Sequence, residues 1–413
     1  MKITRISGLI ALTAAAAVVL TACGSDNNTT GSSAAAGASS AASSAVGGAS
    51  SVAGSAAGSG ASSAAGSSDS ASSAMLSGAT GAAATTFAGA GFTCATGDLR
   101  SSGSTAQGKV ISAWIVAYNA KCGSKINDYG GGGSGKGVSD FTANQSDFGG
   151  SDSALKAAEM AAVKTTRCQG NDAIDLPMVT GPIAVAYNVK GVDKLVLTPK
   201  VLVDIFGGKV TSWNDPEIAD LNKGVTLPGT KISPIHRSED SGTTDNFTKY
   251  LTAAGGWTYP GGKAWTAPGG QGIQGSDGVQ KAIGATDGAI GYAEWGYAVS
   301  GKLAMAEIDN GGGPVALTAE TAAKSVATAQ VVGTGKDLSL KLDYATKTAG
   351  AYPILLVTYE IVCSAGNGDK AALLKSFLGY AATDGQTTAV SNGAAPLPAA
   401  IQTKVIDAIK GLS

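Results

Sequence analysis

Apolar and polar positions beyond residue 86 follow two periods, which predicts helices and strands in alternation. Apolar residues three and four apart predict helices at 107–118, 153–166, 199–206, 215–222, 245–251, 371–382 and 399–409. Short apolar or β-branched runs predict strands at 147–152, 173–187, 231–236 and 354–363, the second interrupted by Pro177 and Pro182. This order is typical of an α/β protein with largely parallel sheets.

The first residues have the pattern of a secretory signal. Lys2 and Arg5 precede an apolar run over 8–20 that is too short to span a bilayer comfortably, and small residues follow it. The ending Leu20-Thr21-Ala22-Cys23 resembles a bacterial lipobox. It implies a signal peptide over 1–22, lipid attachment at Cys23, and a place on the extracytoplasmic face of the cell membrane. The alternative is an ordinary signal peptide with a cysteine nearby.

Residues 23–86 are almost wholly Ser, Ala and Gly. Such a segment cannot bury enough apolar surface to offset its chain entropy, so we expect a disordered tether. A Gly/Ser-rich coil of this length would span on the order of 45 Å. An Ala-driven helix is disfavoured by the interspersed Gly and Ser.

Composition excludes some classes of partner. The formal net charge is −1, so nothing indicates binding to nucleic acid. The roughly 320 residues after the tether are enough for two lobes. A nearly neutral protein can still bind an anion through helix ends and backbone N–H groups. No cluster of residues with metal-ligand spacing is present, and we expect no metal or cofactor.

The cysteines fit an oxidising compartment. With Cys23 lipidated, four remain, and four cysteines allow three disulfide connectivities. We favour Cys94 with Cys122, at the start of the first strand and the end of the first helix, and Cys168 with Cys363. Buried free thiols are the alternative.

One segment concentrates groups that bind oxyanions. Residues 237–244 read RSEDSGTT and combine a guanidinium, hydroxyls and an unhindered glycine. The segment precedes the helix predicted at 245–251, so its N–H groups would lie at a helix N-terminus, which favours an anion. A helix cap in a polar turn is the alternative.

Two further segments point the same way. Residues 130–138 read GGGGSGKGV and nearly match a nucleotide P-loop, but Gly137 stands where the Mg²⁺-binding hydroxyl is required. The loop could therefore cradle an oxyanion without NTPase chemistry, with a helix expected after it. Residues 147–152 read as a strand ending in Ser151 and Asp152, where α/β folds present ligand groups. Asp152 could equally cap a helix.

Together these motifs resemble the phosphate-binding protein of the Pst-type ABC importer. The resemblance covers roughly residues 95–413. It rests on segments in the family's order, at 103–105, 133–138, 148–152, 213–218, 221–222, 237–244, 288–292 and 297–298. It implies a two-lobed periplasmic-binding-protein (type II) fold with two hinge crossings, near Thr180 and Tyr352. Lobe I would comprise 87–179 and 353–413, and lobe II 180–352.

The resemblance also implies a ligand site and a mechanism. Glu239, where the family commonly has Asp, would hold Arg237 by an ion pair. Asp152 would accept a proton from bound phosphate, and closure of the lobes around the anion would present it to membrane permease subunits. We expect a monomer. The residues implied to contact phosphate are Thr105, Ala106 through its backbone, Ser134, Asp152, Arg237, Ser241, Gly242 and Thr243.

Two other functions remain open on the sequence alone. The first is a binder of another oxyanion such as sulfate or molybdate. The second is a secreted phosphatase or hydrolase that uses Ser241. Such catalysis usually needs a base or a metal, and His236 is the one histidine of the chain. A lone histidine at a strand end is more often structural, so we do not expect an enzyme.

Overall fold

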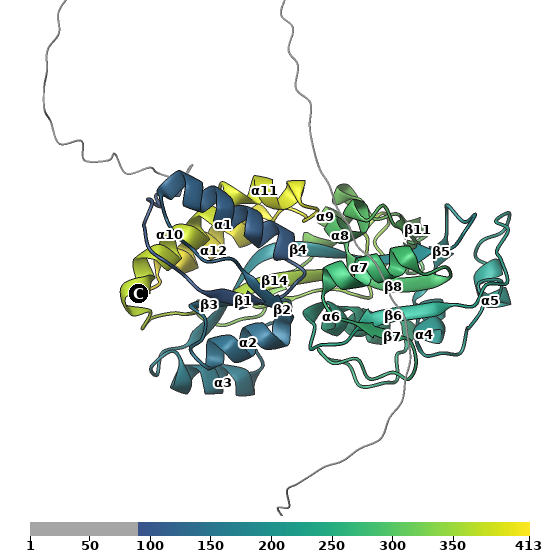
Figure 1. The fold of residues 1–413 in the computed structure, drawn as a ribbon, viewed down its shortest axis with the longest axis horizontal. Helices are drawn as coiled ribbons and strands as arrows, with labels where there is room; N and C mark the ends of the chain where they lie inside the picture. The colour runs from purple at the N-terminus through teal and green to yellow at the C-terminus, as the bar shows by residue number, and fades with distance from the viewer. Residues whose placement is uncertain (1–89) are drawn as a thin grey trace, which may run out of the picture. The chain divides into compact units, whose positions relative to one another are not determined.

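Two long neighbouring strands run through the middle of the protein (Figure 1). The computed structural model describes residues 90–413, and the expectations for the signal, Cys23 and the tether lie outside this range. β4 (Ala173–Asn188) pairs antiparallel with β14 (Leu355–Cys363) as far as Pro182, and from Ile183 onward it pairs with β8 (Ala289–Glu294). β4 and β14 therefore connect two groups of strands, which we call lobe I and lobe II.

The two prolines do not interrupt β4. Pro177 lies where the register with β14 shifts between Thr358 and Tyr359, a β-bulge, and a bulge tolerates the missing N–H group. Pro182 lies where pairing passes from β14 to β8. One continuous strand thus replaces the separate segments expected from the sequence.

Lobe I adds three parallel-paired strands to β14. Their order is β2-β1-β3, and Trp114, Tyr118, Phe148 and Phe377 are buried in its core. The strands are β1 (Ser101–Gly103), β2 (Gly130–Gly132) and β3 (Phe148–Ser151). The helices are α1 (Gly108–Cys122), α2 (Ser134–Thr142), α3 (Ala157–Thr166), α10 (Ala371–Ala382), α11 (Gly385–Ser391) and α12 (Ala399–Lys410).

Lobe II continues the sheet in the order β4-β8-β6-β7, and Phe206, Trp213, Phe247 and Tyr292 are buried in its core. Its principal strands are β6 (Ser233–Arg237) and β7 (Gln271–Ile273) beside β8. Smaller strands are β5 (Val196–Leu197), β9 (Ala304–Met305), β10 (Glu307–Asp309) and β11 (Pro314–Val315). The helices are α4 (Pro199–Phe206), α5 (Pro216–Ala219), α6 (Gly242–Tyr250), α7 (Ser276–Ala285), α8 (Trp295–Ser300) and α9 (Ala319–Val326).

The expectation of largely parallel sheets is wrong for the centre of the molecule. β1 pairs parallel with β2 and β3, and β6 pairs parallel with β7 and β8. The pairs that join these groups, β3–β14, β14–β4 and β4–β8, are antiparallel. The reason is that β4 and β14 cross the molecule in opposite directions, so each lobe pairs its parallel strands against a reversed neighbour.

A hairpin inside the segment 180–352 packs on lobe I. It consists of β12 (Gln330–Val331) and β13 (Leu340–Lys341), and Leu338 between them is buried in the lobe I core. The Leu338 N–H donates to the Asp175 carbonyl at 3.1 Å, and the Asp175 N–H donates to Asp337 Oδ1 at 2.9 Å. The segment expected to form lobe II thus sends one hairpin across to lobe I.

Two disulfides join the cysteine pairs favoured from the sequence. Cys94 is bonded to Cys122 at the end of α1, and Cys168, just after α3, is bonded to Cys363 at the end of β14. Both therefore lie in lobe I. Within residues 90–413 no helix is long and apolar enough to cross a membrane.

Candidate anion-binding site

The glycine-rich segment forms a helix start rather than a loop before a helix. α2 begins at Ser134, so Gly135 to Gly137 are already helical, earlier than expected. Gly137 packs so closely on β3 that a methyl group there would lie 2.3 Å from the Gly150 carbonyl oxygen. Lys136 does not serve as a P-loop lysine, because its Nζ forms an ion pair with Asp140 at 2.5 Å. The glycines thus place Ser134 beside the end of β3.

Ser134 uses all of its hydrogen-bonding capacity at one place. Its buried hydroxyl donates to Asp152 Oδ2 at 3.1 Å and accepts from the N–H groups of Asp152 at 3.0 Å and Gly242 at 3.1 Å. A hydroxyl has one proton and two lone pairs. Since Gly242 belongs to lobe II, this one side chain joins both lobes.

Asp152 is the carboxylate at the centre of the lobe I side. It follows β3 and is 3% exposed, and Oδ1 accepts from Ser104 Oγ at 2.5 Å and from Thr358 Oγ1 at 2.7 Å. Burial raises the pKa of Asp152 to about 6, against the opposing effect of the hydrogen bonds from Ser104 and Thr358. The carboxyl is therefore mainly ionised at neutral pH and protonated in mild acid.

Thr105 and Ala106 lie before α1, but they are placed differently. The Ala106 N–H donates to Ser104 Oγ at 3.1 Å, so this backbone group is already used within lobe I. The Thr105 hydroxyl faces lobe II, where Arg237 Nη2 donates to its oxygen at 2.7 Å. The Ser276 N–H lies 3.3 Å from the same oxygen and Ser276 Oγ 3.0 Å from it. Three potential donors thus surround an oxygen that has two lone pairs.

Arg237 is the last residue of β6 and is 2% exposed. Its Nε donates to Glu239 Oε1 at 2.9 Å and its Nη2 also contacts this oxygen, so the expected ion pair is present despite the longer Glu side chain. Nη1 donates to Thr243 Oγ1 at 3.2 Å and to Ser276 Oγ at 3.3 Å. Burial alone would lower the pKa of Arg237, but the hydrogen bond to Glu239 and the charge of Glu294 raise it.

The N-terminus of α6 faces Asp152 and Ser134. Ser241 is its N-cap, and its hydroxyl accepts from the Thr244 N–H at 3.3 Å. Gly242 has no room for a side chain, because a methyl group would lie 2.4 Å from Ser134 Oγ and 2.5 Å from Asp152 Cβ. Thr243 Oγ1 donates to Glu294 Oε1 at 2.5 Å.

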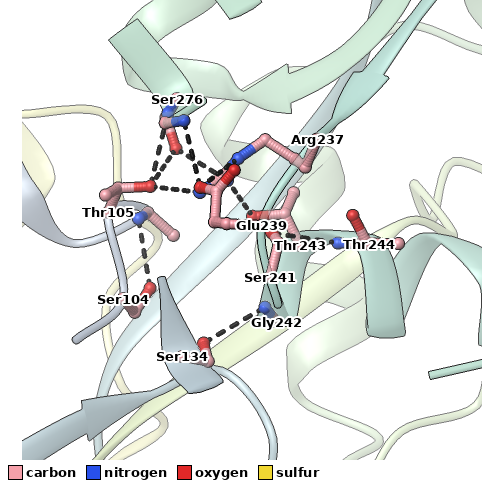
Figure 2. A network of polar contacts seen from close by, with 12 residues as sticks. Ser104, Thr105, Ser134, Arg237, Glu239, Ser241, Gly242, Thr243, Thr244 and Ser276 are labelled. Atoms are coloured by element: carbon pink, nitrogen blue, oxygen red, sulfur yellow. Dashed lines mark hydrogen bonds and ion pairs between the residues drawn. The ribbon is translucent and has the colours of Figure 1, made fainter. Parts of the chain in front are cut away.

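Figure 2 shows these side chains converging from both lobes. Thr105 and Ser134 come from lobe I, and Arg237, Gly242 and Ser276 come from lobe II. The donors comprise a buried guanidinium, several hydroxyls and the N–H groups at two helix starts, which suits an oxyanion. Asp152 is the acceptor placed among them. Among residues 90–413 no group of three or more His, Cys, Asp or Glu side chains could hold a metal ion.

Four contributors to this network were not among the residues expected from the sequence. Ser276 starts α7 after a glycine, a pattern that marks a helix start without marking a site. Glu294 comes just after the motif at 288–292, on which the family resemblance rests, so the sequence did point to this region of the chain. Ser104 precedes Thr105 and belongs to the motif at 103–105, on which the family resemblance also rests. Thr358 lies in the middle of β14, where nothing in the local sequence indicates a ligand.

A groove adjoins the site on the side of Thr105 and Ser276. Its volume is 440 Å³, and Tyr129 and Tyr297 lie in its wall with these two residues. The Tyr297 hydroxyl donates to the Thr105 carbonyl at 3.0 Å. Thr105 and Ser276 therefore line the groove and also contact Arg237.

Comparisons with known proteins find relatives in sequence and in fold. Residues 51–384 match the family model of the PBP superfamily domain. The chain is 41% identical over 322 residues to the phosphate-binding protein PstS 3 of Mycobacterium tuberculosis H37Rv, covering 76% of this chain and 86% of the relative. It is also 41% identical over 323 residues to PstS 2 of the same strain, covering 76% and 87%.

A solved structure has a similar fold. The periplasmic phosphate-binding protein PfluDING, bound with phosphate, superposes with a TM-score of 0.63 at 22% identity, over 75% of this chain and 92% of that chain.

Proposed function

Since the chain belongs to the phosphate-binding proteins of the PBP superfamily, we propose that it binds inorganic phosphate between its two lobes and delivers it to a phosphate ABC importer. The family consists of substrate-binding proteins rather than enzymes. Its members act outside the cytoplasm, where they meet the membrane subunits of the importer.

The observation that carries the proposal is the pairing of Arg237 with Thr105 across the lobes. A buried guanidinium in lobe II reaches a hydroxyl of lobe I at 2.7 Å, and Ser276 adds an N–H group and a hydroxyl to the same place. An anion held there would contact both lobes at once. Contacts made only in the closed form shift the population toward that form.

We assign the contacts to phosphate as follows. Arg237, Thr105 and Thr243 would bind oxygens through charge and hydroxyl groups. The N–H groups at the start of α2 would add backbone donors, and so would the Gly242 N–H of α6 once its bond to Ser134 opens. Asp152 would accept the proton that phosphate retains at neutral pH. Ser241 supports the site as the cap of α6, and the Ala106 backbone contributes only if its bond to Ser104 opens.

Calorimetry with purified, ligand-stripped protein tests the proposal. We expect tight binding of phosphate and arsenate, which both carry a proton at neutral pH, and weak binding of sulfate, which does not. Equal affinity for sulfate and phosphate would indicate a general oxyanion binder. Absence of any phosphate binding would refute the proposed function.

The geometry does not favour a hydrolase that uses Ser241. The Ser241 hydroxyl caps α6, and His236 stacks on Trp265 with ring centroids 4.9 Å apart. His236 Nδ1 lies 3.0 Å from the Arg237 carbonyl oxygen rather than beside Ser241. Turnover of p-nitrophenyl phosphate that is lost in Ser241→Ala would restore the enzyme hypothesis.

We further propose that the protein is a monomer anchored to the outer face of the cell membrane by lipid at Cys23. The lipobox-like ending at residues 20–23 supports this anchor, and stable retention requires more than one acyl chain. Cys23→Ser should release the protein from the membrane fraction or leave its signal uncleaved, with phosphate binding unchanged. A processed Cys23→Ser protein that still fractionates with membranes would contradict the anchor.

A further inference from the structure

Glu360 is a fully buried carboxyl that the proposed contacts to phosphate do not use. It lies in β14, its side chain is 0% exposed, and neither of its oxygens receives a well-formed hydrogen bond. The nearby Gln107 amide favours the ionised form and opposes the effect of burial, but its Nε2 donates to the Tyr129 hydroxyl at 3.2 Å. A carboxylate buried without donors is costly, so the surroundings of Glu360 favour its protonated form.

The strand register places Glu360 beside Asp152. Glu360 is two residues from Thr358, which donates to Asp152 Oδ1 at 2.7 Å, so both side chains lie on one face of β14. On the neighbouring strand, Glu360 pairs with Gly150, two residues before Asp152. A methyl group at Gly150 would lie 2.2 Å from Tyr129 Oη and 2.4 Å from Gln107 Nε2, so these two side chains fill the space over that glycine.

The charges around Glu360 favour its neutral form. Burial and the charge of Asp152 raise the pKa of Glu360 to about 8. Opposite Glu360 on β4 is the apolar Leu176. Besides Asp152, the titratable group that interacts with Glu360 is the Tyr129 hydroxyl. Across the site, the charge of Glu294 also raises the pKa of Asp152. The cation Arg237 lies in lobe II and is paired with Glu239. No cation offsets Glu360 within lobe I among the contacts of the described residues.

We propose that Glu360 is a proton-binding residue of the anion site. In the ligand-free protein at neutral pH it holds a proton, which leaves Asp152 as the one ionised carboxyl on the lobe I side of the site. An anion that arrives beside Asp152 adds negative charge, so Glu360 binds its proton more tightly in the complex. Where Glu360 is ionised in the free protein, binding takes up one proton from solvent. This inference rests on the proposed function and adds a source of pH dependence to it.

The first experiment compares phosphate affinity between pH 6.5 and 9 for the wild type, Glu360→Gln and Asp175→Asn. Asp175 is a matched control, because it is also a buried acid whose pKa burial raises to about 8, but it contacts the β12–β13 hairpin rather than the site. The ionisation of phosphate itself is common to all three proteins.

Relative to Glu360→Gln, the wild type should lose affinity as pH rises through 8, by about tenfold at pH 9. Asp175→Asn should follow the wild type. Identical profiles for the wild type and Glu360→Gln would overturn the inference.

A second measurement does not depend on the folding of Glu360→Gln. In an Asp175→Asn background, infrared spectroscopy follows the C=O stretching band of a protonated carboxylic acid. In the ligand-free protein this band should fade through about pH 8, and saturating phosphate should make it persist to higher pH. A band that is absent at pH 7, or that phosphate leaves unchanged, would refute the proposal. Failure of the wild type to bind phosphate would instead refute the proposed function.

Discussion

At the scale of single residues, the site depends on one buried cation whose partners come from both lobes. Arg237 contacts Glu239 and Thr243 within lobe II and Thr105 within lobe I. Glu239 fixes the guanidinium through Oε1, which also accepts from the Gly275 N–H at 3.0 Å. The planar group is therefore held in place before any ligand arrives, which lowers the cost of ordering it on binding.

Replacing Arg237 with Ala should weaken phosphate binding by about 30-fold to several thousand-fold. Loss of a charged partner at a buried site costs about 2–5 kcal/mol. Arg237→Lys should restore only part of the affinity, since it keeps the charge and loses the planar fork. Calorimetry measures the affinities and circular dichroism checks the fold. Wild-type affinity in a folded Arg237→Ala protein would place the site elsewhere.

Asp152 should decide between phosphate and sulfate. Its ionised carboxyl can accept a proton from phosphate, but it would repel an unprotonated sulfate oxygen in a closed site. Asp152→Asn should therefore raise sulfate affinity by about tenfold or more.

In the wild type, lowering the pH should raise the sulfate affinity for the same reason. Its Asp152 pKa of about 6 lies above the ordinary value, so the carboxyl gains a proton as pH falls through 6 and becomes a donor. Sulfate affinity should then rise in the wild type and stay nearly constant in Asp152→Asn. Titrations at pH 5 and pH 8 measure both effects, and a sulfate affinity that is independent of pH in the wild type would exclude this role.

Local sequence motifs predicted some residues of this network. The other residues join it through contacts between segments that are far apart in the sequence. Ser134, Asp152, Arg237 and Gly242 stand in compact segments whose chemistry already suggests an anion, and the structure brings them together. Thr358 could not be predicted in this way, because it reaches Asp152 only through the pairing of β14 with β3, over 206 positions.

At the scale of elements, the starts of α2, α6 and α7 meet the ends of β3 and β6 where glycines remove side chains. α2 approaches lobe II so closely that a methyl group at Gly135 would lie 2.5 Å from Asp240 Cβ. The Gly135 N–H donates to the Asp240 carbonyl at 3.0 Å. Glycine richness at 130–137 predicted a loop, but close packing rather than flexibility explains these glycines. A single sequence cannot separate the two causes, since both select residues without side chains.

Gly242→Ala should weaken phosphate binding without unfolding the protein. The added methyl group would clash with Ser134 Oγ and Asp152 Cβ, which belong to lobe I, so the cost falls on the closed form. Gly261→Ala is a suitable control, since its methyl group would meet nothing closer than Thr248 Oγ1 at 3.5 Å. Small-angle scattering with saturating phosphate should show the compact form for the control and a more open form for Gly242→Ala. Equal affinities would show that the two lobes do not close on this helix start.

At the scale of the whole molecule, the hairpin adds a connection between the lobes. The chain leaves lobe II after α9, packs Leu338 in the lobe I core, and returns to lobe II, where Leu342 and Tyr344 pack against its core. Alternation of helices and strands predicted two lobes, but this excursion is too short and too polar to stand out in the sequence. Its position follows from Asp175, whose Oδ2 accepts from Leu155 N–H at 3.0 Å and Ser339 Oγ at 3.2 Å.

Asp175 should make the ligand-free protein less stable as pH rises. Burial and the charge of Asp337 raise the pKa of Asp175 to about 8, so between pH 4 and pH 8 the folded state binds more protons than the unfolded state. The stability from this group is complete below pH 4 and is lost as pH rises through 8. Asp175→Asn should flatten this dependence and raise Tm at pH 8 more than at pH 4. Parallel Tm curves against pH for both proteins would contradict the assignment.

The paired strands β4 and β14 also have a kinetic consequence. The Ile183 N–H donates to the Ile354 carbonyl at 2.9 Å, so two of the chain segments that join the lobes are hydrogen-bonded to each other where they cross. An anion captured by one lobe therefore meets the other at a high effective concentration set by this ribbon rather than by a flexible linker. Closure is then a first-order step that follows capture. The observed rate in stopped-flow mixing should rise with phosphate concentration and then level off at the rate of that step.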